Sequence, residues 1–514
     1  MTPIRLMRSF ATVGGWTLAS RILGFVRDIM IARFLGAGAA SDAFFVAFSL
    51  PNMFRRFFAE GAFNPAFIPM FTKKLEANRD DAEHFARDAF WVMTTFLIVF
   101  TLVASLAMPA LVWLMASGFV GDDRFDLAVG FGRIAFPYIL LISLTALMSG
   151  MLNASGRFAA AAAAPVLLNI VFILGMTVAV YAGFPIAETL AWSIPLGGIA
   201  QFVTVYIAIR RLGFSLRFRM PQITPDLKQM LAIALPAIFA GGVTQINLLV
   251  GRQVASHTDK AISWLNYADR LYQLPLGVVG IAVGVVLLPE LSRRLRTGDQ
   301  ELGQAAFNRG MEFSLALTVP SAMGLILCAE PLISVLFERG AFTQEDSWAT
   351  AMALALYGAG LPAFVLHKVL QPLYWARGDT RTPFRFAVVS MVVNAVVAVG
   401  AMPFIGYLSA AMATSMAAWT MVLLLWNGAR PMGIAAQVDA RMRDRWWRIV
   451  VATLTMGVVL YGAVQIFDVE LHSHGRIFWL IALITLGAVT YFGVGGLIGA
   501  FRMSDFKSAL RKGS

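Results

Sequence analysis

The sequence has little charge, since Asp, Glu, Lys and Arg make up only 14% of its 514 residues. A soluble domain carries about 25%. Hydrophobic residues reach 59%, and apolar stretches recur along the whole chain with no polar domain between them. These features exclude an ordinary soluble fold and predict a polytopic membrane protein.

Cysteine and histidine are also scarce. The single cysteine, Cys328, excludes an intramolecular disulfide, and the five histidines are scattered without a metal-binding spacing. We therefore expect no metal site and no cofactor. A cleaved signal peptide is not expected either, because the first apolar segment contains Arg21, Arg27 and Asp28.

Apolar segments long enough to cross a bilayer are abundant, and no alternating pattern typical of barrel strands accompanies them. The predicted fold is all-α, with fourteen transmembrane helices at 9–34, 40–58, 88–117, 127–153, 159–183, 187–210, 229–254, 262–290, 310–336, 347–375, 386–403, 407–427, 447–467 and 477–500.

The basic residues of the loops predict the orientation. Basic clusters follow every second span, and only four of the 41 Lys and Arg fall in the opposite set of loops, namely Arg124, Lys260, Arg339 and Arg476. The positive-inside rule then places both termini in the cytoplasm. This distribution explains most of the net charge of +12 without a nucleic-acid partner.

A weak internal repeat divides the chain. Residues 68–75 resemble residues 288–295, and Ala154-Ser155-Gly156 resembles Ala376-Arg377-Gly378. An offset of six spans preserves orientation, so we predict two pseudo-symmetric six-helix lobes, 1–220 and 221–435, followed by an additional helix pair at 436–514. Transporters built from repeats place their substrate between the halves.

Nine basic residues fall within the predicted spans, where a charge at the centre of a lipid-facing helix costs about 2.5–3.5 kcal/mol. Arg21, Arg27 and Arg270 lie deepest, and we expect them to face a wet cavity. Arginine binds phosphate or carboxylate bidentately and stays charged. The cavity is therefore predicted to bind a polyanionic substrate. Arg133, Arg252 and Lys368 are equally compatible with structural pairing.

Several motifs resemble the MurJ/MviN lipid II flippases of the multidrug/oligosaccharidyl-lipid/polysaccharide exporter superfamily. They are SRILGFVRD at 20–28, GAG at 36–38, SDAFFVAF at 41–48, LPNMFRRFFAEGAF at 50–63 and YADR at 267–270. The resemblance implies a flippase of the bacterial inner membrane, not an enzyme. It would carry lipid II, the undecaprenyl-pyrophosphate-linked peptidoglycan precursor, to the periplasmic leaflet by alternating access.

The same resemblance implies the substrate-binding residues, which by motif position are Arg21, Arg27, Asp28, Asp42, Asn52, Arg55, Glu60, Ser263 and Arg270. It also implies a groove for the polyprenyl tail at the last two spans, and partners among membrane lipids and other cell-wall synthesis proteins. A sodium site is not supported, because the seventh span offers Thr244, Gln245 and Asn247 but no acid.

Other functions remain open at this point. One is a flippase for another lipid-linked oligosaccharide, and a second is a cation-coupled multidrug exporter, which would have twelve spans and an acidic site. A membrane glycosyltransferase would need catalytic residues on a sizeable outer loop, whereas the outer loops here are short. A scaffold protein would not need intramembrane charge.

Overall fold

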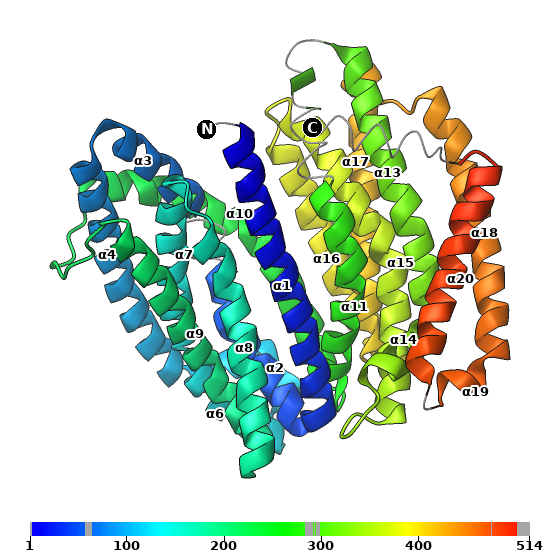
Figure 1. Ribbon diagram of the computed structural model, residues 1–514, viewed down its shortest axis with the longest axis horizontal. Helices are drawn as coiled ribbons and strands as arrows, with labels where there is room; N and C mark the ends of the chain where they lie inside the picture. Colours follow the sequence, from blue (N-terminus) through cyan, green and yellow to red (C-terminus); the bar gives the residue numbers. More distant parts are fainter. Residues whose placement is uncertain are drawn as a thin grey trace. The chain divides into compact units, whose positions relative to one another are not determined.

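The computed structural model describes residues 3–56, 64–282, 291, 293–294, 299–473 and 475–500, and over these residues every regular element is a helix (Figure 1). The chain forms two compact units. Unit 1 comprises Met1–Ser263 with Arg339–Phe342, and unit 2 comprises Trp264–Glu338 with Thr343–Ser514. Each unit is described by itself.

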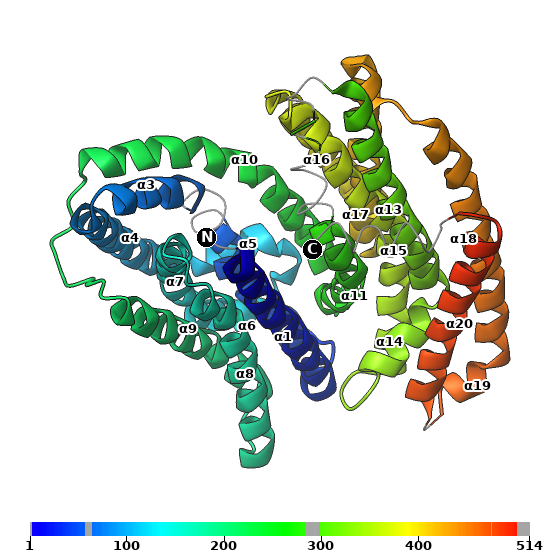
Figure 2. The ribbon, with the colours of Figure 1, turned by 45° about the horizontal axis from the view of Figure 1, so that its top comes forward.

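Unit 1 is a helical bundle in which α1 packs on α8, α2 on α6, and α9 on both α7 and α8. The helix α10 runs along α3 (Figure 2). The bounds are α1 Pro3–Leu35, α2 Ala39–Arg55, α3 Asn64–Ala77, α4 Arg79–Leu106, α5 Met108–Met115, η2 Ser117–Phe119, α6 Asp123–Ala135, α7 Tyr138–Ala154, α8 Ala159–Ala182, α9 Ile186–Arg211 and α10 Pro225–Ser256.

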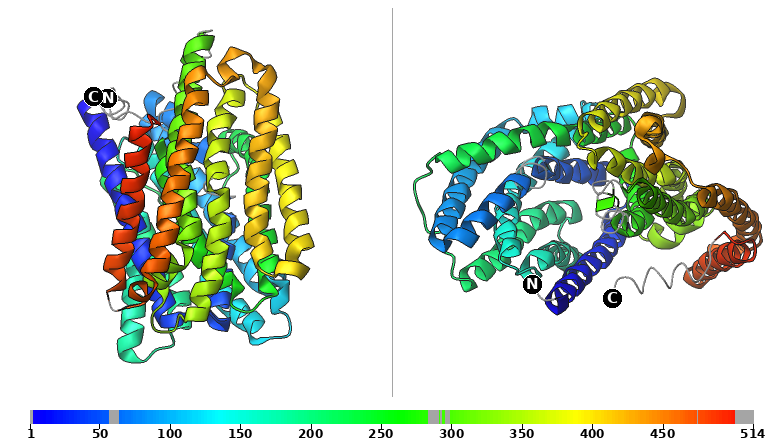
Figure 3. Two further views of the ribbon diagram at one scale, coloured as in Figure 1. Left: turned by 90° about the vertical axis from the view of Figure 1, so that its right-hand side faces the viewer. Right: turned by 90° about the horizontal axis from the view of Figure 1, so that it is seen from above.

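Unit 2 is built around α15, which packs against α13 and α17, while α16 packs on α17. The last two long helices, α18 and α20, lie side by side, and α18 also packs on α13 (Figure 3). The bounds are α11 Ala261–Ala282, α13 Gln300–Leu327, α14 Ala329–Phe337, α15 Gln344–Trp375, α16 Arg381–Ile405, α17 Leu408–Ala429, η4 Arg430–Met432, η5 Ile434–Ala436, α18 Ala440–Ile466, α19 Asp468–Leu471 and α20 Arg476–Leu497.

Ten helical stretches in the described part of the chain are long and apolar enough to cross a membrane. The prediction of an all-helical polytopic membrane protein is therefore confirmed. Each of the ten coincides with a predicted span, and the other four predicted spans fall on α1, α2, α10 and α11.

Proline divides some of the predicted spans, because it cannot donate a backbone hydrogen bond inside a helix and clashes with the preceding turn. The span at 88–117 becomes α4 and α5, with Pro109 in the first turn of α5. The span at 127–153 becomes α6 and α7, separated at Phe136-Pro137. The span at 310–336 is interrupted at Cys328, three residues before Pro331.

A cluster of charges fixes the start of α18 on α13. The buried carboxylate of Glu312, 8% exposed, accepts hydrogen bonds from Arg309, Arg441 and Arg445. Asp439, the N-terminal cap of α18, accepts from Arg309 and from the Met442 N–H. One buried acid therefore joins three guanidinium groups from two helices, which compensates for its desolvation.

The other end of the α18–α20 pair is held against α14. The His472 ring contacts the Asp468 carbonyl through Nδ1, at 2.8 Å, and the Glu330 carboxylate through Nε2, at 3.2 Å. Arg476 donates to the Glu338 carbonyl at 2.6 Å. The hydrogen bond to Asp468 and the nearby Glu330 carboxylate raise the pKa of His472 above its usual 6.5, although partial burial opposes them.

This shift predicts a pH-dependent stability. A histidine whose folded pKa is raised stabilises the fold fully below its unfolded pKa, and the contribution is lost as the pH rises through the folded value. The variant His472→Gln should therefore unfold at a lower temperature than the parent at about pH 5.5 and at nearly the same temperature at about pH 8.5. Thermal unfolding of the purified protein measures this. The matched control is His84→Gln, an exposed histidine of α4, and an equal deficit at both pH values would contradict the assignment.

Candidate functional site

The deepest cation of unit 1 is Arg27 on α1, a buried cation with 7% of its surface exposed. Its Nε and Nη2 donate to Asp28 Oδ1 at 3.0 and 2.7 Å, and its Nη1 donates to Asn169 Oδ1 on α8 at 2.9 Å. The ring of Phe172 lies 5.4 Å from the guanidinium carbon. An arginine has five N–H groups, and these three hydrogen bonds use three of them.

Asn169 links α1 and α8. It accepts from Arg27 and donates through Nδ2 to the Ser20 carbonyl at 3.0 Å. Gly24 faces Asn169 at this contact, and a Cβ at that position would lie 3.5 Å from Asn169 Nδ2, an ordinary van der Waals distance. Asn169 is itself 6% exposed, so its polar groups must find partners inside the protein.

Thr17, Arg21, Gly24 and Asp28 recur at helical spacing along α1 and lie in two environments. Thr17 and Arg21 are exposed, Gly24 faces α8, and Asp28 is buried. Arg21 and Arg27 therefore differ, because Arg21 is accessible in this conformation whereas Arg27 is held between α1 and α8.

The remaining predicted residues are dispersed over the described helices. Arg55 is half-buried at the end of α2, and its neighbour Arg56 is exposed. Asn52 donates to the Phe48 carbonyl of its own helix. Arg270 is half-buried on α11 of unit 2, next to Asp269, which accepts from Gln273. Glu60 lies outside the described residues.

Asp42 and Ser263 are brought together, at the end of unit 1 where α1 finishes. Asp42 is completely buried, and its Oδ1 accepts from the Ser263 N–H at 2.9 Å and from the Ser263 hydroxyl at 2.6 Å. The carboxylate of α2 thus caps the first turn of α11. Neither side chain is open to a ligand in this conformation.

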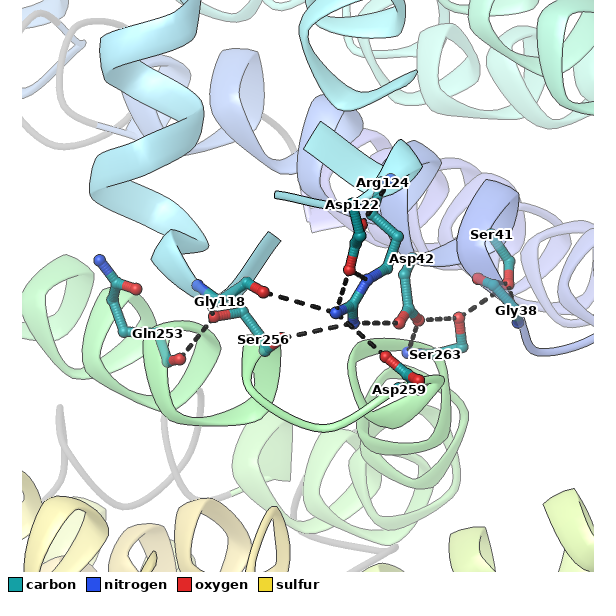
Figure 4. A network of polar contacts seen from close by, with 10 residues as sticks. All are labelled: Gly38, Ser41, Asp42, Gly118, Asp122, Arg124, Gln253, Ser256, Asp259 and Ser263. Atoms are coloured by element: carbon teal, nitrogen blue, oxygen red, sulfur yellow. Dashed lines mark hydrogen bonds and ion pairs between the residues drawn. The ribbon is translucent and has the colours of Figure 1, made fainter. Parts of the chain in front are cut away.

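Arg124, at the start of α6, approaches three carboxylates (Figure 4). Its Nε donates to Asp122 at 2.7 Å, its Nη2 lies 3.0 Å from Asp259, and its Nη1 lies 3.9 Å from Asp42 Oδ2. We call the group Asp42, Asp122, Arg124, Asp259 and Ser263 the Asp42 clasp. It joins α2 and α6 to the connection between α10 and α11.

The charge of Arg124 affects the acids around it. Partial burial acts to raise the pKa of Asp122, but the hydrogen bonds and positive charge of Arg124 outweigh it and hold that pKa below its usual value. Asp122 therefore stays ionised and keeps its hydrogen bonds over a wide range of pH.

The end of α10 is fixed to the same region of unit 1. Gln253 Oε1 accepts from the N–H and the hydroxyl of Ser117, at 2.8 and 2.9 Å. The Gly118 N–H donates to Ser256 Oγ at 3.0 Å. A Cβ on Gly118 would lie 2.6 Å from the backbone of Ser256, so only glycine permits this approach.

The sequence prediction omitted Asn169, Arg124, Asp122 and Asp259. Arg124 carried a usable signal, because it is one of only four basic residues in the loops that are otherwise free of basic charge. Asn169 carried less, since a single asparagine in an apolar span does not identify its partner.

The contacts of Asn169 predict the effect of its loss. The variant Asn169→Ala leaves a buried guanidinium donor of Arg27 without its acceptor and removes the hydrogen bond to the Ser20 carbonyl, which should cost about 1–3 kcal/mol. We expect a lower unfolding temperature of the purified protein. Asn153→Ala, at an exposed position of α7, is the matched control, and equal unfolding temperatures for the two variants would count against the Arg27–Asn169 link.

The Asp42 clasp predicts a change in accessibility. Ser41 is 1% exposed and bonds to Ser263, and the natural Cys328 is buried. In a Cys328→Ala background, Ser41→Cys should react slowly with a water-soluble maleimide, and adding Arg124→Ala should raise the labelling rate because the clasp loses its only cation.

The control for that labelling is Arg133→Ala, which removes an exposed arginine of α6 whose side chain donates to the Ser105 carbonyl. It should leave the rate unchanged. The role given to Arg124 is refuted if both substitutions raise the rate equally.

Comparison with known proteins agrees with these features. The family described as lipid II flippase MurJ matches residues 31–481. A probable lipid II flippase MurJ of Rhizobium tropici is 42% identical, over 99% of this chain and 97% of its own. The corresponding protein of Rhizobium meliloti (strain 1021) is 43% identical over the same shares.

Solved structures support the same conclusion. A lipid II flippase MurJ in an inward closed conformation matches with a TM-score of 0.80 and 26% identity, over 94% of this chain and 98% of that one. An inward-facing multidrug resistance transporter matches with a TM-score of 0.69 at 14% identity, over 82% of this chain and 96% of that one, and so shares the fold. The chain is a multi-pass membrane protein that belongs to the lipid II flippase MurJ family.

Proposed function

We propose that this protein translocates lipid II from the cytoplasmic to the periplasmic leaflet of the bacterial inner membrane. The observation that carries the proposal is similarity over nearly the whole chain to proteins described as lipid II flippases. The activity is transport by alternating access and needs no catalytic residue.

The proposed topology has fourteen spans. Ten are the apolar helical stretches, and α1, α2, α10 and α11 supply the rest. With both termini in the cytoplasm, α1 runs outward and the Asp42 clasp lies at the periplasmic end of unit 1. We retain the lobes 1–220 and 221–435 and the additional pair at 436–514 as part of this proposal.

The substrate-binding residues are proposed to be those of the sequence motifs, with the pyrophosphate meeting Arg21, Arg27, Arg55 and Arg270. Guanidinium groups suit this anion because they bind phosphate oxygens in pairs and keep their charge. The burial of Arg27 supports the proposal, since a cation at bilayer depth persists only where partners or a function retain it. Asp28 and Asn169 orient it through hydrogen bonds.

The Asp42 clasp is proposed to be a closure at the periplasmic end of unit 1. In this conformation Asp42 and Ser263 are fully buried against each other. Release of lipid II on that side would require a second conformation in which these hydrogen bonds break. Under this proposal, Asp42 and Ser263 act on the substrate pathway by controlling access to it. Asn52 and Glu60 remain proposed contacts of the substrate.

The lipid tail requires an apolar surface. A cavity of about 340 Å³ in unit 2 lies between α13, α18 and α20, and its lining includes Pro320, Met456, Leu460, Leu483 and Tyr491. Among the described residues that line it, none is charged. We propose that it accepts part of the polyprenyl chain, as expected for the helix pair α18–α20.

The proposal predicts which cations are indispensable. Arg27→Ala or Arg270→Ala should abolish lipid II transport while the protein inserts at normal abundance, because the pyrophosphate loses a charged partner. Arg133→Ala, at an exposed arginine outside the proposed set, should transport normally. An abundant Arg27→Ala/Arg270→Ala double variant with full activity would reject the arginine site.

Depletion of the protein in cells tests the function itself. Labelled lipid II should then accumulate in the cytoplasmic leaflet, and its detection by a probe specific for the outer leaflet should fall. If labelled lipid II still appeared in the outer leaflet at an undiminished level, the flippase assignment would be refuted. If another lipid-linked oligosaccharide accumulated instead, the protein would be assigned as a flippase for that substrate.

A further inference from the structure

Two turns in the chain have the same geometry, one in each unit. After α7, the Arg157 N–H donates to the Leu152 carbonyl at 2.8 Å, and Gly156 has φ +72°. After α15, the Asp379 N–H donates to the Tyr374 carbonyl at 3.1 Å, and Gly378 has φ +75°. Both are glycine-terminated helix ends of the Schellman type. The next helix begins two residues later in each case, at Ala159 and Arg381.

The matched position after the glycine holds opposite charges in the two units. In unit 2 it is Asp379, whose carboxylate accepts the Thr382 N–H at 3.0 Å and so satisfies the start of α16. That hydrogen bond holds the pKa of Asp379 below its usual value. In unit 1 the position holds Arg157. A cation therefore stands where the other unit supplies an anion.

Among the residues that the structure describes, no acid contacts the start of α8. Its preceding residue, Phe158, makes no side-chain cap, and the N–H groups of Ala159, Ala160 and Ala161 donate to no acceptor in the described part of the chain. These groups carry the partial positive charge of a helix N-terminus. Water molecules alone would satisfy these N–H groups.

The start of α8 opens onto a cavity, however. The cavity has a volume of about 960 Å³ and is lined by residues of α1, the α7–α8 turn, the start of α8 and the end of α9, all in unit 1. Arg157 and Arg211 both line it. Neither makes an ion pair within the described residues. We call it the α8 pocket.

The charge of the α8 pocket fits a doubly charged anion. Two exposed arginines and the start of α8 line it, and its lining has no carboxylate among the described residues, whereas a phospholipid phosphodiester carries one charge. The volume lies in the range of about 300–1,000 Å³ that is typical of ligand sites. A pyrophosphate diester attached to a lipid matches both the charge and the size.

We infer that the α8 pocket is a cytoplasmic docking site for the pyrophosphate group of the lipid-linked substrate, occupied before that group reaches Arg27. The inference rests on the proposed function. The pocket and Arg27 share the same two helices, because Thr12 of α1 and Ala159 of α8 line the pocket while Arg27 and Asn169 meet farther along them. Ala159 and Asn169 are separated by ten residues, or about 15 Å along α8.

The test uses the full-length protein in phosphatidylcholine nanodiscs, with farnesyl pyrophosphate as the probe and farnesol as the uncharged control. Arg157→Asp places in unit 1 the residue that unit 2 tolerates at the matched turn, so it should fold and unfold at a temperature no lower than the parent. It should weaken farnesyl pyrophosphate binding about tenfold or more, since it replaces a charge-assisted contact with repulsion. Arg211→Gln should weaken binding in the same direction.

The matched control is Arg210→Gln, because Arg210 neighbours Arg211 on α9 but does not line the pocket. It should bind the probe normally. Unchanged affinity in the Arg157→Asp/Arg211→Gln double variant would overturn the inference. Equal displacement of the probe by phosphatidylglycerol, or by inorganic phosphate, would also overturn it, by showing a phospholipid headgroup or a free anion as the occupant.

Transport measurements distinguish a failure of this inference from a failure of the proposed function. In Arg157→Asp the concentration of lipid II needed for half-maximal transport should rise while the maximal rate is retained, whereas Arg27→Ala should abolish the rate. If Arg157→Asp transports with an unaltered half-maximal concentration and maximal rate while Arg27→Ala is inactive, the docking site is refuted and the flippase function stands. If lipid II reaches the outer leaflet without this protein, the function fails irrespective of the pocket.

Discussion

The structure of unit 1 depends on how it retains a buried guanidinium, that of Arg27. Desolvation of an arginine is costly unless it is paired and hydrogen-bonded, and Arg27 meets this requirement by using Asp28 on its own helix and Asn169 on α8. The same hydrogen bonds join the two helices, because Asn169 accepts from Arg27 Nη1 and donates to the Ser20 carbonyl. The α1–α8 contact is therefore set by electrostatics as much as by apolar packing.

The helical architecture could be predicted from the sequence because bilayer thickness imposes a length on every span and the alternation of basic loops imposes a direction. The predicted spans 159–183 and 187–210 require no knowledge of neighbouring helices, and the corresponding helices α8 and α9 lie where hydropathy indicates. The breaks at Pro109, Pro137 and Cys328 were not anticipated, because proline does not reveal whether a span will bend or divide.

Only part of the candidate site could be predicted from the sequence. Arg21, Arg27 and Asp28 stand out because charge is conspicuous in an apolar segment, but the sequence does not state which cation is enclosed and which is exposed. Asp42 and Ser263 are separated by 221 residues, so their pairing is a property of the folded chain. Arg124 likewise becomes significant only in the folded chain, where Asp42 and Asp259 from distant segments join the neighbouring Asp122 around it.

The attachment of α18 to α13 has a different consequence. Three arginines converge on the single carboxylate of Glu312, and the acid at the head of α18, Asp439, accepts a hydrogen bond from one of them, Arg309. Neutralising Glu312 would leave these guanidinium groups close together without the carboxylate that they share, so repulsion among them would loosen this end of α18. The opposite end of the helix pair would keep its own contacts, through His472 and Arg476, so the pair would swing about that end while the arginines around Glu312 separate.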